Sequence, residues 1–76
     1  MEFILSAIRT GQRAVVTSIS DACPLKSRLR EFGLVPGTML QCRFKSPGGD
    51  LAALEVRGAV IALRVRDLSD ITARSC

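Results

Sequence analysis

Three cysteines are the residues of this chain with the clearest capacity for metal or redox chemistry. Cys23, Cys42 and Cys76 form no CxxC spacing, and the sequence contains no histidine. Tight iron or zinc sites need several N, O or S ligands that converge at fixed spacing. We therefore expect no metal site and no cofactor. The odd cysteine count also disfavours a disulfide framework and fits a reducing compartment.

Catalytic constellations are equally sparse. Without histidine, a serine or cysteine nucleophile would lack its usual general base. Asp67 and Asp70 are three residues apart, a spacing better explained by a turn than by an acid/base pair. No GxxxxGK[ST] loop offers a phosphate site. The sequence therefore predicts a binding protein that has no catalytic residues and is not an enzyme.

The net positive charge gives the strongest case for an alternative function, which is nucleic-acid binding. Eleven basic and seven acidic residues leave a net charge of +4, which favours anionic partners. Barrels that bind single strands normally add stacking aromatics, whereas Phe32 and Phe44 are expected in the core here. Nucleic acid is thus the alternative rather than the expected partner. The basic residues that support it are Arg28, Arg30, Arg43, Lys45, Arg57, Arg64 and Arg66.

Length limits the architecture to one small domain, residues 1–76. Its longest apolar runs, Leu51–Leu54 and Ala59–Leu63, are far shorter than the roughly 20 residues that a membrane helix needs. The first apolar run has no basic segment before it, unlike a signal peptide. We expect a cytoplasmic protein.

One helix is expected, over Pro24–Phe32. Leu25, Leu29 and Phe32 repeat there at i, i+4 and i+7 and form one apolar stripe. The helix should end at Gly33, because glycine enters the left-handed region without a Cβ clash. Cys42, further along the chain, is expected to behave as a small buried hydrophobic residue.

The remaining chain indicates short strands joined by turns. In Met39–Lys45 the alternation places Leu40, Cys42 and Phe44 on one buried face. The other expected strands are Arg13–Ile19, Leu51–Val56, Ala59–Arg64 and Ile71–Ala73, with Arg66–Asp70 as a bend or one helical turn. Turns are expected at Pro36-Gly37, at Ser46–Asp50 with Gly49 and Asp50, and at Arg57-Gly58. About five short strands bury one face only if the sheet curls, so we predict a mainly β, partly open barrel.

An ordered set of short motifs runs from Leu5 to Ala73. It consists of Leu29 with Phe32-Gly33-Leu34, Pro36-Gly37-Thr38, Pro47 with Gly49-Asp50, and Ile61-Ala62-Leu63-Arg64. In this set the chain resembles the ferrous iron transport protein A (FeoA) family and the related small barrel of some metal-dependent repressors. The resemblance implies an SH3-like barrel without enzymatic activity. It also implies a cytoplasmic accessory protein of FeoB, a membrane transporter of ferrous iron with a cytosolic GTPase domain.

We expect the partner to contact the helix and the corner after it. Lys26, Arg28 and Arg30 could steer this surface towards an acidic protein or the inner leaflet. At the corner, the core is favoured for Leu34 and exposure for Val35. The expected contact residues are Leu25, Lys26, Arg28, Arg30, Leu34, Val35 and Pro36. Two alternatives stay open beside this one: nucleic-acid binding, and association with itself or with a metal-dependent repressor.

Overall fold

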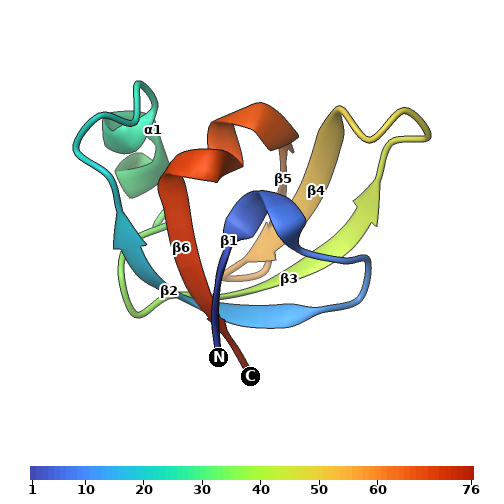
Figure 1. Cartoon of the computed structure of the whole chain (residues 1–76), viewed down its shortest axis with the longest axis horizontal. Helices are drawn as coiled ribbons and strands as arrows, with labels where there is room; N and C mark the ends of the chain where they lie inside the picture. Colours follow the sequence, from blue (N-terminus) through green and yellow to red (C-terminus); the bar gives the residue numbers. More distant parts are fainter.

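A single antiparallel sheet curls around the core in this computed structural model, which describes residues 1–76 (Figure 1). Its strands are β1 (Glu2–Ile4), β2 (Arg13–Ile19), β3 (Met39–Lys45), β4 (Leu51–Val56), β5 (Ala59–Arg64) and β6 (Ile71–Ser75). Their order in the sheet is β1-β6-β2-β3-β4-β5, so β1 and β5 are the edges. The predicted mainly β, partly open barrel is confirmed, with six strands instead of about five.

Three short helices complete the chain. The 3-10 helix η1 (Leu5–Ala7) lies near the centre of Figure 1, the 3-10 helix η2 (Val65–Asp70) lies above it, and α1 (Lys26–Glu31) lies at the upper left. Helix η2 confirms the predicted bend before the last strand. No helix has the length and apolar character that crossing a membrane requires.

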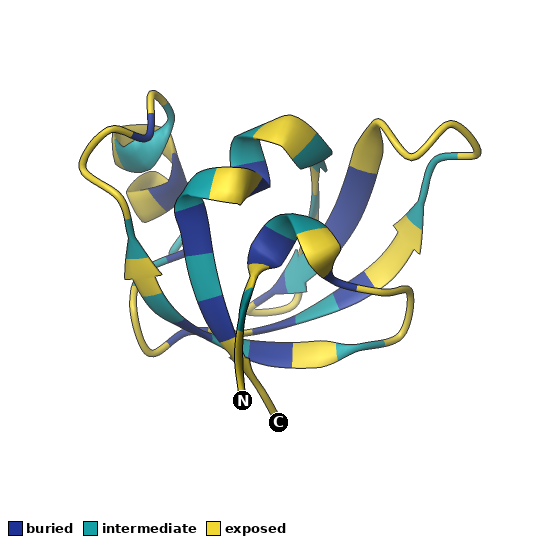
Figure 2. Cartoon of the chain, in the orientation of Figure 1, coloured by how far each residue is buried: buried dark blue, intermediate teal, exposed yellow.

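The core lies inside the curl of the sheet, where buried and exposed residues alternate along the strands (Figure 2). Two predictions are confirmed there, because Leu34 and Cys42 are both fully buried. The largest buried side chains come from all parts of the chain: Leu5, Ile8, Leu29, Leu34, Leu40, Leu54, Leu68 and Ile71.

The prediction that Phe44 belongs to the core is wrong. Along β3 and β4, Cys42 pairs with Leu54 but Phe44 pairs with Ala53, so the register shifts between Cys42 and Phe44. Arg43 is therefore an extra residue on β3, a β-bulge that reverses the alternation after it. The Phe44 side chain is 60% exposed as a result.

The helix is shorter than the predicted Pro24–Phe32. A turn precedes it, in which the Lys26 N–H donates to the Cys23 carbonyl over 3.2 Å. At the other end Phe32 is the C-cap residue and is 44% exposed, so its predicted place in the core is also wrong. The helix ends at Glu31, one residue before Phe32, so only Leu29 of the predicted apolar stripe lies within it.

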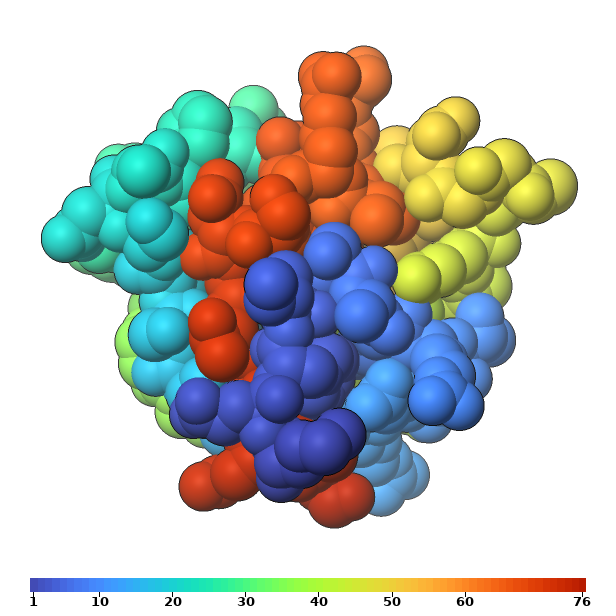
Figure 3. Space-filling model, viewed as in Figure 1, coloured from blue at the N-terminus to red at the C-terminus, as the bar shows by residue number.

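Strand β1 was not predicted. It pairs with β6 in the register Glu2↔Arg74, and both chain ends lie together at the bottom of Figure 1. In Figure 3 the N-terminal segment crosses the front of the molecule against the C-terminal segment. Three residues carry too little periodicity to indicate a strand, and pairing with a distant strand stabilises them here.

Candidate functional site

A groove runs between helix α1 and strand β5. Its volume is about 400 Å³, and six of its nine lining residues are hydrophobic. The helical side supplies Leu25, Arg28, Leu29 and Phe32, the strand supplies Ile61 to Arg64, and η2 adds Asp67. Leu29 is buried and anchors the helix to the core, whereas Phe32 leaves part of its ring in solvent. The groove therefore offers an apolar floor with charged residues at its margins.

The end of α1 is held in place by backbone hydrogen bonds. Gly33 has φ +87°, and its N–H donates to the Arg30 carbonyl over 3.0 Å. The Leu34 N–H donates to the Leu29 carbonyl over 2.8 Å. These two bonds form a Schellman motif, in which the apolar side chains of Leu29 and Leu34 are both buried. This motif sets where Phe32 leaves the helix and faces the groove.

Thr38 reinforces the corner after the helix. Its buried hydroxyl donates to the Gly33 carbonyl over 2.8 Å and accepts the Val35 N–H over 3.2 Å. One side chain thus satisfies two backbone groups that the turn leaves without partners. These hydrogen bonds stabilise the corner that follows the helical wall of the groove.

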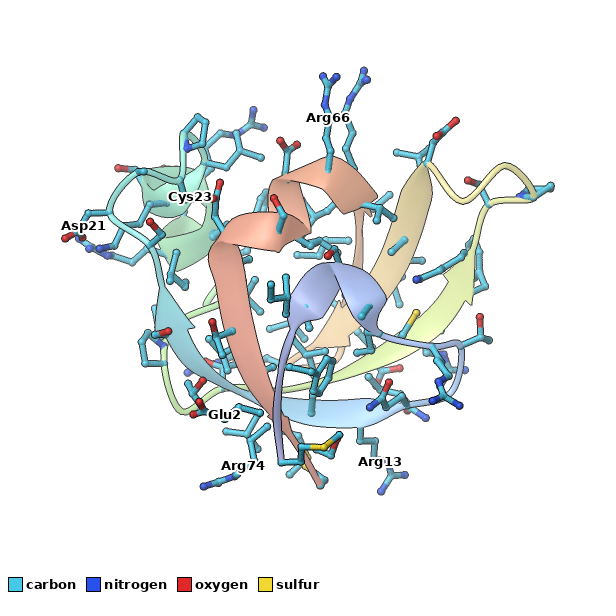
Figure 4. The ribbon with its side chains drawn as sticks, in the orientation of Figure 1. Glu2, Arg13, Asp21, Cys23, Arg66 and Arg74 are labelled. Atoms are coloured by element: carbon cyan, nitrogen blue, oxygen red, sulfur yellow. The ribbon has the colours of Figure 1, made fainter.

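Of the predicted contact residues on the helix, two line the groove and two do not. Leu25 and Arg28 belong to the lining. Lys26 pairs instead with Asp21, and the hydrogen bond and charge of Lys26 lower the pKa of that carboxyl. Arg30 is exposed but lies outside the lining. Figure 4 shows Asp21 at the outer margin of the molecule, beside α1.

The three predicted contact residues at the corner differ in how far they are buried. Leu34 is fully buried and has no surface to offer a partner. Val35 is half-buried, and Pro36 is exposed. Neither lines the groove.

The turn residues occupy the positions that the sequence indicates. Gly33, Gly37, Gly49 and Gly58 all have positive φ. Asp50 closes the β3–β4 hairpin, and its carbonyl accepts the Val65 N–H over 2.8 Å.

Sequence reasoning missed the second wall of the groove. Strand β5 follows α1 by almost thirty residues, and only the curl of the sheet brings them together. The apolar run from Ala59 to Leu63 predicts the strand, but no signal in the sequence indicates that it faces the helix.

Positive charge surrounds the groove. Only two ion pairs form, Lys26 with Asp21 and Arg43 with Glu55 at 3.3 Å. Arg28 and Arg64 both line the groove, against a single acidic residue, Asp67. Further along the chain, the labelled Arg66 extends away from the body of the molecule (Figure 4).

The three cysteines are free thiols, and none of them lines the groove. Cys23 and Cys42 are buried, and Cys76 is exposed. Burial raises the pKa of the Cys42 thiol, and the charge of Lys45 opposes this to a smaller extent. No three His, Cys, Asp or Glu side chains come together in a group that could hold a metal ion.

Solved structures of similar architecture include FeoA proteins and metal-dependent repressors. The FeoA protein of Chlorobium tepidum is 30% identical, with a TM-score of 0.88 over 96% of this chain and 70% of its own. The zinc-complexed FeoA of Stenotrophomonas maltophilia, described as a prokaryotic SH3 domain protein, is 29% identical, with a TM-score of 0.81 over 93% and 88%.

A manganese-dependent transcriptional repressor has the same fold. Its TM-score is 0.88 at 21% identity, and the match covers 99% of this chain but only 41% of the repressor. The search of curated proteins gave no match. The model of the FeoA domain matches residues 4–75, nearly the whole chain. With an SH3-like barrel and this match, the chain belongs to the FeoA domain family.

Proposed function

We propose that this chain is a cytoplasmic, non-enzymatic accessory protein of ferrous iron uptake that binds the cytosolic part of a FeoB-type GTPase transporter. Membership of the FeoA family supports the connection with iron uptake. The similar S. maltophilia protein has itself been suggested as a bacterial ferrous iron transport activating factor. The groove between α1 and β5 is the observation that carries the proposal of a protein contact.

Phe32 is the expected anchor of this contact. A large aromatic ring that is partly exposed beside an apolar floor can bury further area when a partner docks. Leu25, half-buried on the same wall, would widen the apolar area. Arg28 and Arg64 would attract an acidic surface and set its orientation more than its affinity.

Calorimetric titration into the purified cytosolic domain of the transporter tests the proposal. The titration is run with GDP and with a GTP analogue, and a reductant keeps the exposed Cys76 thiol from oxidising. We expect saturable binding whose affinity depends on the nucleotide. Absence of binding in both nucleotide states would refute a contact with this domain.

Two phenylalanines offer a matched pair of variants. Phe32→Ser should weaken binding about tenfold or more, because truncating a hot-spot aromatic residue commonly costs about 2 kcal/mol of binding free energy. Phe44 is even more exposed but lies outside the groove, so Phe44→Ser should bind as the unmodified chain does. Equal losses in both variants would place the contact elsewhere.

A second candidate function follows from the exposed Phe44. Phe44 lies between Arg43 and Lys45 in the sequence of β3, so an exposed aromatic ring and basic residues occur close together for a single nucleic-acid strand. Within the chain, Arg43 pairs with Glu55 and Lys45 donates to the Ser6 carbonyl. Titration with single-stranded RNA at several salt concentrations tests it. A steep loss of affinity with salt, and a further loss in Phe44→Ser, are expected of this function. No binding at low salt would remove it.

A further inference from the structure

We propose that an extended acidic segment of the partner pairs with β5, the edge strand, and lies inside the groove. This inference deepens the proposed function and rests on it, because it names the kind of segment that the same groove would take. It depends on the hydrogen-bonding state of β5, on the groove beside it and on the charge around both.

The turn before β5 determines which of its backbone groups face outward. Arg57 and Gly58 both have positive φ, as in a two-residue type I′ hairpin, so Val56 and Ala59 form a hydrogen-bonded pair. Such pairs alternate along an antiparallel ladder. Ile61 therefore bonds to β4, and so does Leu63. The N–H and C=O groups of Val60, Ala62 and Arg64 point away from the sheet.

Apart from the C=O of Arg64, which is the N-cap residue of η2, these outward groups have no partner in the chain. Strand β5 pairs only with β4, and no backbone hydrogen bond from a loop or turn reaches Val60, Ala62 or Arg64. The pairing has no register shift, and the strand contains no proline, so none of these common protections blocks this edge. A segment of about five residues would satisfy the row at the usual rise of 3.4 Å per residue.

The groove provides the packing that a bare edge lacks. Its strand wall is formed by residues of this same edge, Ile61 to Arg64, and its opposite wall by Leu25 and Phe32. Alternate side chains of an added strand would face the half-buried Ile61 and Leu63 and the helix. The other side chains would lie on the side of Val60, Ala62 and Arg64. An apolar and polar alternation is thus expected of the segment.

Charge favours an acidic segment over a second copy of this chain. Arg28 and Arg64 line the groove against Asp67 alone, and the whole chain carries +4. Acidic side chains directly beside Arg64 would form a favourable cross-strand pair. A second copy would instead bring another positive surface. The predicted segment therefore alternates acidic and apolar residues.

An NMR titration tests the proposal with a synthetic probe. The probe is an acetylated, amidated hexapeptide, Glu-Val-Asp-Leu-Asp-Val, added to the ¹⁵N-labelled full chain. We expect saturable shifts of the Val60, Ala62 and Arg64 amides. The same peptide with lysine in place of its acidic residues should bind at least about tenfold more weakly.

Substitution of Ala62 separates backbone pairing from side-chain contact. Ala62→Pro removes an outward N–H, which an edge strand tolerates, so the fold should persist. We expect about a tenfold loss of affinity for the acidic peptide, which corresponds to one backbone hydrogen bond near the upper end of its usual contribution. Ala62→Val keeps the N–H and should lose less affinity than Ala62→Pro, so the difference between the two variants measures the lost backbone donor.

Several outcomes would overturn the proposal: no saturable binding of the acidic peptide, equal binding of the lysine peptide, or full binding by Ala62→Pro. Concentration-dependent shifts of the β5 amides without peptide would make a second copy the occupant. Failure of the proposed function would look different. If the peptide binds at β5 but the transporter domain does not bind, only the transporter proposal fails. If the transporter domain binds Ala62→Pro and the unmodified chain equally, only strand addition fails.

Discussion

The Arg57 side chain lies against Gly33, so closely that a Cβ on Gly33 would stand 3.1 Å from both Cδ and Nε of Arg57. Gly33 ends α1, and Arg57 begins the turn into β5. The turn into β5 therefore contacts the end of α1.

Gly33→Ala should destabilise the fold more than the same change at Gly37. Both glycines have positive φ, +87° and +94°, which costs an alanine about 1 kcal/mol. Only at Gly33 does a new Cβ meet another side chain, since nothing lies within 4 Å of the corresponding position at Gly37. We expect a further loss of about 1 kcal/mol at Gly33, measured by chemical denaturation.

The Arg57→Ala background provides the control for this contact. Removing the guanidinium should abolish the extra cost of Gly33→Ala and leave the cost at Gly37 unchanged. An extra cost that persists without the Arg57 side chain would show that the contact does not limit Gly33.

Thr38→Val should lower the unfolding free energy by about 1–3 kcal/mol. Valine keeps the shape of threonine but leaves the Gly33 carbonyl and the Val35 N–H without their hydroxyl partner. Thermal unfolding measures the loss. Thr38→Ser retains the hydroxyl and should lose less, and a valine variant as stable as the unmodified chain would contradict this role of the hydroxyl.

Most strands could be predicted because their signals are local. Alternation and turn residues gave the bounds of β2, β3, β4 and β5. Strand β1 could not be found in this way, because its stability depends on pairing with β6 at the far end of the chain. Phe44 was misplaced because one extra residue at the bulge reverses every later side chain, and nothing in the alternation marks Arg43 as extra.

The groove could be predicted only in part. The apolar spacing predicted the stripe of Leu25, Leu29 and Phe32, and all three residues line the groove. The opposite wall depends on where the curled sheet places β5, a property of the whole topology. The exposure of Phe32 depends on where the helix ends, and the Schellman bonds at Gly33 decide this to within one residue.

Arg28→Glu should slow association with the acidic partner that we propose. The residue lines the groove, and reversal of its charge replaces attraction by repulsion during encounter. We expect the association rate to fall about tenfold at low salt and the difference to shrink as salt screens the charges. Stopped-flow or surface-plasmon measurements at several ionic strengths give the rates.

Arg30→Glu is the matched control for this charge reversal. It lies on the same short helix, is equally free of ion pairs and does not line the groove. Both variants lose a favourable charge near the helix C-terminus, so their effects on stability should be alike. Equal slowing by both would show that the general charge of the chain, not the groove, guides the encounter.

Stability should fall at alkaline pH because of Cys42. Burial raises the pKa of this thiol in the folded chain, whereas the unfolded thiol titrates near an ordinary value of about 8.5. Between these two values the unfolded state has lost its proton and the folded state has kept it. The contribution of Cys42 is thus fully present below about pH 8.5 and is lost as pH rises through the folded pKa.

Denaturation of the unmodified chain and of Cys42→Ala, from neutral to alkaline pH with reductant, measures how steeply the unfolding free energy of each falls with pH. Cys76→Ala, which removes an exposed thiol, should keep the slope of the unmodified chain; a Cys42→Ala variant with that same slope would contradict the assignment.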